Sequence, residues 1–101
     1  MINIEPRAGE LYSATEHYVL SIGDEVVCVD FGPQVDDILI SSPEGDVLCS
    51  WDTDGWQDDE CLLIKTVDNM KELGNVKCTH FYLKSYVPGK VIKVFLTGQR
   101  N

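Results

Sequence analysis

Short apolar runs separated by turn residues recur along the chain. The first clear pair is residues 18–22 (YVLSI) and residues 25–31 (EVVCVDF), on either side of Gly23-Asp24. Runs of this length that are rich in Val, Ile, Tyr and Phe are typical of β-strands. We therefore expect two strands joined by a tight turn at Gly23-Asp24. Gly32-Pro33 should end the second strand, because proline cannot donate a hydrogen bond to the ladder.

Two further pairs of apolar runs follow the same plan. They are residues 37–41 and 47–51 around the turn residues 42–46, and residues 81–86 and 90–96 around Pro88-Gly89. Proline sets the first corner of a type II turn, and glycine accepts the positive φ of the second. Each pair is predicted to form two strands joined by a turn.

One segment has a helical pattern instead of a strand pattern. Val67, Met70 and Leu73 recur at a spacing of three, which places them on one face of a helix. Thr66 is a suitable N-cap, an acid follows in the first turn, and Gly74 can end the helix. The pattern predicts one short helix near 66–73.

The apolar run 61–64 fits a helix or a strand, because so short a run has no distinguishing period. A strand is favoured, since Asp54-Gly55 would then form a type I′ loop that joins it to residues 47–53.

The same hairpin makes a prediction about the two tryptophans. A loop at Asp54-Gly55 places Thr53 opposite Trp56 and Trp51 opposite Asp58. Alternation then puts both tryptophans on one face as diagonal neighbours. We expect Trp51, next to the apolar strand, to be mainly structural and Trp56, beside the loop, to be mainly exposed.

These elements predict an α+β fold that is mainly antiparallel β. We expect six or seven strands, arranged as an open barrel or a sandwich, with one short helix before the last pair of strands. A chain of 101 residues with 44% hydrophobic content is expected to form a single domain, residues 1–101, around its own core. No apolar run approaches the ~20 residues of a membrane span, and the first residues lack the features of a signal peptide. We therefore expect a cytoplasmic protein that does not engage a membrane.

Acidic and basic residues are segregated along the sequence. Between Arg7 and Lys65 there are 14 acids and no lysine or arginine, whereas residues 65–101 carry seven bases and two acids, and the net charge is −9. The densest group is residues 50–60, with five carboxylates and two tryptophans. A solvated hairpin tip is one interpretation. The absence of interleaved lysines favours another, a surface that meets a basic groove, where carboxylates steer the encounter and an aromatic ring anchors it.

The chain is accordingly expected to be a non-enzymatic, acidic protein-binding module. It would occupy a basic, nucleic-acid-binding site on another protein, such as a nuclease or a nucleoprotein complex. Phage inhibitors that mimic DNA and immunity proteins that block toxin nucleases are similar in size and charge. The expected partner-binding residues are Asp52, Asp54, Trp56, Asp58, Asp59 and Glu60. Direct binding of nucleic acid by the acidic half is disfavoured because phosphates would be repelled. A weaker alternative is a nucleic-acid platform in residues 65–101, formed by Phe81, Tyr82 and Tyr86 with Lys77, Lys84, Lys90 and Lys93. The bases of residues 65–101 are expected instead to neutralise the acidic half inside the fold.

The second hypothesis is a divalent-cation-binding or small enzymatic domain that uses the carboxylates of residues 52–60. The spacing from Ser50 to Asp58 imitates the opening of a calcium loop, but the twelfth position, which should be glutamate, is Cys61. Recognisable catalytic motifs are absent from the sequence, and no cofactor or metal is expected. The four cysteines have no zinc-site spacing, and they are expected to be small buried thiols in a reduced compartment. A site built from distant cysteines with His17 or His80 stays open.

Overall fold

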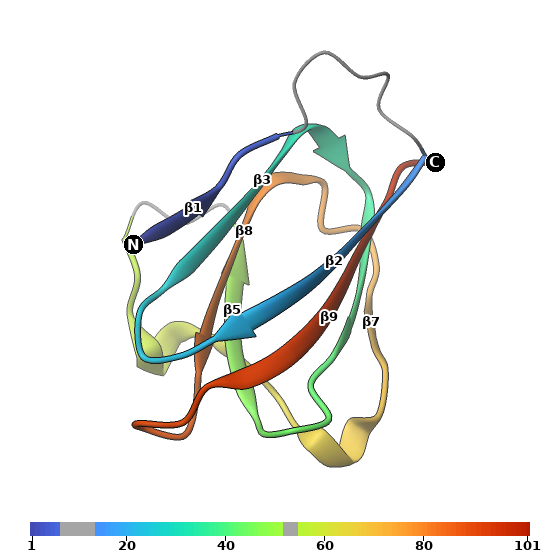
Figure 1. Cartoon of the computed structure of the whole chain (residues 1–101). Coiled ribbons are helices and arrows are strands. Elements are labelled where there is room, and N and C mark those ends of the chain that lie inside the picture. Colours follow the sequence, from blue (N-terminus) through green and yellow to red (C-terminus); the bar gives the residue numbers. More distant parts are fainter. Residues whose placement is uncertain (7–13, 52–54) are drawn as a thin grey trace.

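Two β-sheets pack face to face in the computed structural model, which describes residues 1–6, 14–51 and 55–101 (Figure 1). The five-stranded sheet has the order β1 (Ile2–Ile4), β3 (Val27–Val35), β8 (Cys78–Ser85), β5 (Val47–Trp51), β6 (Leu62–Ile64). The four-stranded sheet has the order β2 (Thr15–Ile22), β9 (Ile92–Gln99), β4 (Asp37–Ser41), β7 (Lys71–Leu73). Two short 3₁₀ helices, η1 (Asp58–Glu60) and η2 (Thr66–Asp68), lie in the connections. The prediction of a mainly antiparallel β fold is confirmed; the described ranges hold nine strands, not six or seven, and β1–β3 is a parallel pair.

The core follows from the alternation of side chains along the two central strands. In β9, Ile92, Val94 and Leu96 are buried between exposed neighbours. In β8, Phe81 and Leu83 are fully buried and alternate with half-buried residues. Successive side chains of a strand point to opposite faces, so one face of each sheet builds the common core.

All three predicted turns exist, but none of them joins two paired strands. β2 pairs with β9, whereas β3, which follows the turn at Gly23-Asp24, pairs with β8 and β1. The turns at residues 42–46 and at Pro88-Gly89 likewise lead from one sheet to the other. The hairpin pairing was wrong because turn residues set the local corner and do not select the partner of the strand that follows. Burial of the apolar face against the opposite sheet decides that partner.

Strand β3 does not end at Gly32-Pro33. Its pairing with β8 shifts register between Asp30 and Val35, so the glycine and proline form an irregular bulge inside the strand. Gly32 has a φ of 77°, which favours glycine, and its N–H donates to Asp30 Oδ1 at 2.8 Å. The Arg100 guanidinium donates to the carbonyl oxygens of Phe31 and Pro33, at 3.0 Å each. These side chains satisfy main-chain groups that the bulge removes from the ladder.

The predicted helix near 66–73 is wrong. The helical conformation is limited to η2, Asn69 at φ 65° follows it, and the chain then enters strand β7. Val67 and Met70 are 86% and 63% exposed, and Leu73 pairs with Ile38 of β4. The helical face would have had to bury all three side chains together, whereas pairing with β4 buries only the last.

The prediction that residues 61–64 form a strand is confirmed by β6, which pairs with β5. The register differs from the prediction by two residues: Cys49 lies opposite Leu62, and Trp51 lies opposite Phe81 of β8. The expected loop falls partly on residues 52–54, outside the described residues. Over the ranges that the structure describes, none of the helices combines the length and the apolar character needed to span a bilayer.

Candidate partner-binding site

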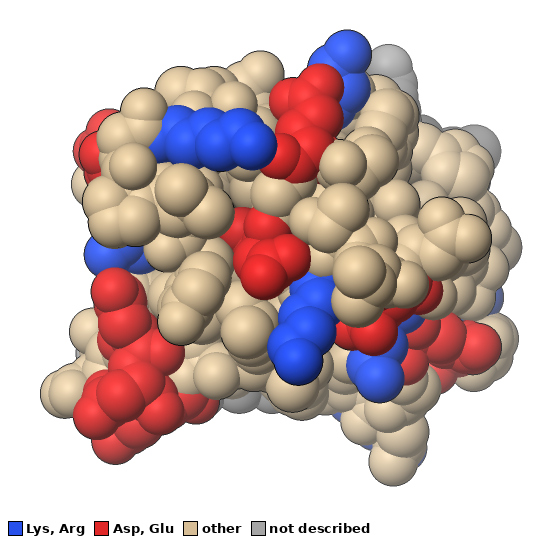
Figure 2. All heavy atoms as spheres, turned by 90° about the horizontal axis from the view of Figure 1, so that it is seen from below, with Lys and Arg blue, Asp and Glu red and all other residues tan. Residues whose placement is uncertain are grey.

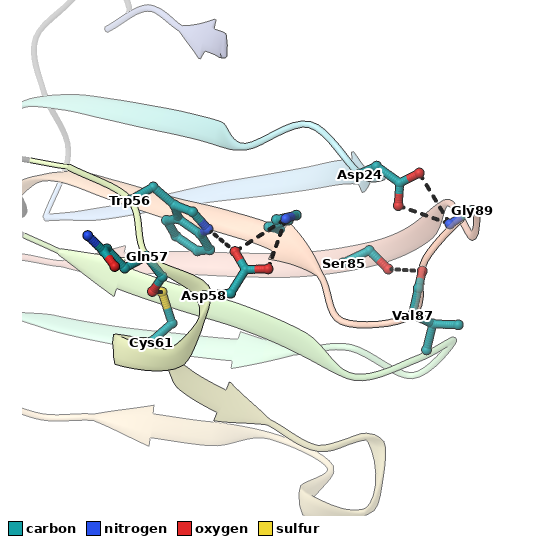
Figure 3. A network of polar contacts seen from close by, with 9 residues as sticks. Asp24, Trp56, Gln57, Asp58, Cys61, Ser85, Val87 and Gly89 are labelled. Atoms are coloured by element: carbon teal, nitrogen blue, oxygen red, sulfur yellow. Dashed lines mark hydrogen bonds and ion pairs between the residues drawn. The ribbon is translucent and has the colours of Figure 1, made fainter.

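The segment 55–61, here called the acidic strap, lies against the outer face of the five-stranded sheet. Asp58, in η1, contacts Lys84 of β8, with Nζ 3.0 Å from Oδ2 and 3.2 Å from Oδ1. The Trp56 indole N–H also donates to Asp58, and the Cys61 thiol donates to the carbonyl oxygen of Gln57, with an S–O distance of 3.1 Å (Figure 3). Lys84 alternates with the buried residues Leu83 and Ser85. Lys84 therefore points away from the core and holds the strap on the outer face of the sheet.

The ionised form of Asp58 is favoured by these contacts. Hydrogen bonds from Lys84 and then from Trp56 hold the pKa of the Asp58 carboxyl below its usual range, against a smaller opposing effect of burial. The Asp58 side chain is 55% exposed, so solvent screens its attraction to Lys84. The pair positions the strap and contributes little to the free energy of unfolding.

The acidic strap forms one side of a pocket of about 500 Å³. Its lining comes from four segments of the chain: Asp24, Leu48, Asp58, Asp59, Lys84, Ser85, Tyr86 and Pro88. Leu48 alternates with the core residues Val47 and Cys49 and so belongs to the outer face, yet it is only 7% exposed. The pocket thus combines an apolar surface with three carboxylates and one ammonium group.

The opposite side of the pocket is a turn that is fixed by hydrogen bonds. Both Asp24 carboxylate oxygens accept from the N–H of Gly89, at 2.9 and 3.2 Å, and the Ser85 hydroxyl donates to the carbonyl oxygen of Val87 at 3.2 Å (Figure 3). Gly89 has a φ of 75°, a conformation that favours glycine. Tyr86, held by this turn, is 53% exposed. The pocket therefore has a large aromatic side chain at its edge.

The predicted site residues are divided between different places. Asp52 and Asp54 lie outside the described residues. Asp58 and Asp59 line the 500 Å³ pocket, whereas Glu60 lines a smaller pocket of about 210 Å³ together with Trp51. The sequence pattern does not assign the other pocket residues to the site, among them Asp24, Leu48, Lys84 and Tyr86. It marks Asp24 only as a turn residue, and only the fold brings Asp24 near the strap.

The two tryptophans do not form a single surface patch. Trp51 is half-buried, packs against the core and stacks on Phe81, with ring centroids 6.0 Å apart. Trp56 is also half-buried, but its partner Asp58 binds Lys84, which belongs to the outer face of the same sheet. The structural role expected for Trp51 fits this packing, while the expectation that Trp56 is mainly exposed is wrong. Trp51 shares the inward face of β5 with Val47 and Cys49, as alternation along the strand requires, whereas the strap that carries Trp56 folds over the outer face.

The acidic and basic halves of the sequence are interleaved in space. The face seen from below carries blue and red side chains next to one another, with one all-acidic group at its edge (Figure 2). Arg100 pairs with the buried Glu16, with Nη2 2.5 Å from Oε2, and the Lys90 Nζ donates to the carbonyl oxygen of Glu44 at 2.6 Å. In the Arg100–Glu16 and Lys84–Asp58 pairs, a base of the second half neutralises an acid of the first, whereas Lys90 contacts only a main-chain oxygen.

Cys28, Cys49 and Cys61 have little thiolate character. The four cysteines form no disulfide with one another; Cys28, Cys49 and Cys78 are buried as expected, and Cys61 is half-buried. Burial is the largest of the effects that raise the pKa of Cys28 and of Cys61. It also raises the pKa of Cys49 to about 12. A protonated thiol is a poor nucleophile and a poor metal ligand.

Among the residues whose positions are described, no three His, Cys, Asp or Glu side chains are grouped so that they could hold a metal ion. Comparison of the chain with protein-family models, with curated proteins and with solved structures finds no match. The 500 Å³ pocket is the candidate functional site, because it is concave, partly apolar and strongly acidic at once.

Proposed function

We propose that this chain is a non-enzymatic protein-binding module that occupies a basic surface of another protein. The contact would be centred on the 500 Å³ pocket between the acidic strap and the turn that carries Tyr86. The observation that supports this most is the lining of the pocket, where Asp24, Asp58 and Asp59 face a single lysine beside apolar groups. A pocket with this lining suits a ligand that is positively charged and partly apolar, as basic protein surfaces are.

The surroundings of the pocket supply what a protein interface needs. Tyr86 and its neighbour Val87 are 53% and 40% exposed, and aromatic side chains are enriched at the centres of interfaces. The carboxylates would speed the encounter, and the apolar contacts would slow dissociation.

The chemical class of the partner follows from the charge. At −9 the chain repels phosphate groups, so a nucleic acid is a poor direct ligand. A protein that binds nucleic acid offers the complementary basic groove. We therefore place nucleases and nucleoprotein components first among the partners to test, with this chain acting as an inhibitor that blocks their nucleic-acid site.

The test measures binding to a panel of purified basic nucleases and nucleoid proteins by surface plasmon resonance. Between about 50 mM and 500 mM NaCl, where the Debye length shortens from roughly 14 Å to 4 Å, the association rate should fall more than the dissociation rate rises. A bound panel member should also lose its affinity for duplex DNA when this chain is present. Binding that does not depend on salt, or no binding to any member of the panel, would overturn the proposal.

Two variants locate the contact on the protein. Asp59→Lys and Tyr86→Ala should each weaken binding by about 1–3 kcal/mol, as expected for residues at the centre of an interface. Glu72→Lys is the matched control, since it makes the same change of charge at an exposed position of β7 in the other sheet. An effect of Glu72→Lys equal to that of Asp59→Lys would show that only the overall charge matters.

A further inference from the structure

The pocket has a more specific preference than positive charge, and this inference rests on the proposed function. We infer that it receives one arginine side chain of the partner. The aliphatic stem would lie along Leu48 and Pro88, and the guanidinium would meet Asp59, Asp24 and the ring of Tyr86. The argument uses the free acceptor capacity of the pocket, its size and its aromatic edge.

The carboxylates of the pocket differ in what they can still accept. Asp58 already receives Lys84 on both oxygens and Trp56 on one of them. Asp24 receives the N–H of Gly89 on both oxygens, and each oxygen keeps a second lone pair. Asp59 is exposed and lines the pocket from the strap. A new cation is thus directed toward Asp59 and Asp24, with Asp58 and Lys84 as the fixed wall.

The size and lining favour arginine over lysine. A volume of about 500 Å³ exceeds what a single ammonium group needs. A guanidinium is planar, presents five donors to several acceptors at once, and stacks on aromatic rings. The exposed Tyr86 offers such a ring at the edge of the pocket, where a cation over its face is attracted by the ring electrons. The apolar part of the lining matches a three-carbon stem.

The test uses a defined probe, the peptide acetyl-Gly-Gly-Arg-Gly-Gly-amide, titrated into the ¹⁵N-labelled full chain at low salt. Two matched peptides replace arginine by lysine or by citrulline, which has nearly the shape of arginine without its charge. We expect amide shifts that cluster at Asp24, Leu48, Asp59 and Tyr86, and a dissociation constant on the order of 1 mM, as suits a single side chain. The lysine peptide should bind several-fold more weakly, and the citrulline peptide about tenfold more weakly.

Variants of the protein separate the pocket from the general surface charge. Asp59→Asn and Tyr86→Ala should each weaken the arginine peptide about fivefold, which is the size of a lost ion pair or cation–π contact. Glu72→Gln removes the same charge as Asp59→Asn on the other sheet and should change binding less than twofold.

Equal binding of the arginine and citrulline peptides, or shifts spread evenly over the exposed acids, would overturn the inference. If the arginine peptide fails while a basic protein still binds with salt dependence and with sensitivity to Asp59→Lys, the arginine assignment is wrong and the proposed function stands. If the peptide binds as expected but no basic protein does, the pocket is an arginine site and the proposed function is wrong.

Discussion

Within the described part of the chain, seven carboxylates accept hydrogen bonds from main-chain N–H groups: Asp24 from Gly89, Asp30 from Gly32, Asp36 from Asn101, Asp37 from Asn75, Glu44 from Lys93, Asp46 from Thr66 and Asp68 from Lys65. Hydrogen bonds to a charged acceptor are stronger than those between neutral groups, and they satisfy amides that the sheets leave unpaired. Many of the acidic side chains therefore stabilise the fold by accepting hydrogen bonds from main-chain amides. The sequence shows the excess of charge but not these contacts, because most of them join residues 20 or more positions apart.

Glu16 and Arg100 form the most buried ion pair among the described residues. Glu16 and Arg100 side chains are 2% and 15% exposed. Glu16→Ala leaves the guanidinium without its carboxylate, and we expect the free energy of unfolding to fall by about 3 kcal/mol in urea titrations. The exposed control Glu72→Ala should stay within about 0.5 kcal/mol of the wild type. Equal losses in the two variants would contradict a structural role for the pair.

The Asp58 carboxyl gives a prediction about pH. Its pKa is lowered in the folded chain by Lys84 and Trp56, so the stabilisation from its ionised form is present above the usual value of 3.8 and is lost as the pH falls through the lowered folded value. An NMR titration of the side-chain carboxyl carbons should give Asp58 a midpoint below 3.8.

The matched variant for this titration is Lys84→Gln, which removes the ammonium group that lowers the pKa of Asp58 most. Its Asp58 midpoint should rise toward the usual value. A midpoint that the substitution leaves unchanged would show that Lys84 does not hold the strap.

Among the elements, the strands themselves were largely predictable and their partners were not. Short apolar runs located β8 and β9, and turn residues located three of the corners. Each of those corners leads to the other sheet, so the strands beside it belong to different ladders. The helix prediction was wrong for a related reason. An apolar spacing of three in so short a segment does not fix a helix when the edge of a neighbouring strand, here β4, can pair with the segment.

The candidate site was predictable only in part. The density of acids and tryptophans led to the strap and so to Asp58 and Asp59. The residues that complete the pocket, such as Asp24 and Tyr86, belong to turns that are far from the strap in the sequence, one before it and one after it. Their approach depends on which sheet each turn enters, and local sequence does not carry that information.

The packing of the two tryptophan side chains predicts how acrylamide quenches their fluorescence. Trp51 stacks on Phe81 inside the sandwich, and Trp56 is held on the outer face by Asp58. Because both side chains are half-buried, acrylamide should quench the single-tryptophan variants Trp56→Phe and Trp51→Phe to similar extents. A much stronger quenching of the fluorescence of Trp56 would support the exposed hairpin tip that the sequence suggested.

The whole molecule is built from pairings between distant parts of the sequence. β2 pairs with β9 along its full length, from Thr15 opposite Gln99 to Ile22 opposite Ile92. Folds dominated by such non-local contacts pay a large loop-closure entropy before the contacts form. We expect stopped-flow refolding to take roughly milliseconds to seconds, and refolding within microseconds would contradict the topology.

The place of β9 in its sheet also has a consequence for synthesis of the chain. β9 lies between β2 and β4 in the sheet but follows both of them in the sequence. Until β9 has been synthesised, β2 and β4 therefore have no strand between them to join them. The ribosome must release residues 92–99 before that sheet can close, so the nascent protein carries unpaired strand edges until then. This molecule should depend on chaperones that bind extended segments more than a protein whose strands pair in the order in which they emerge.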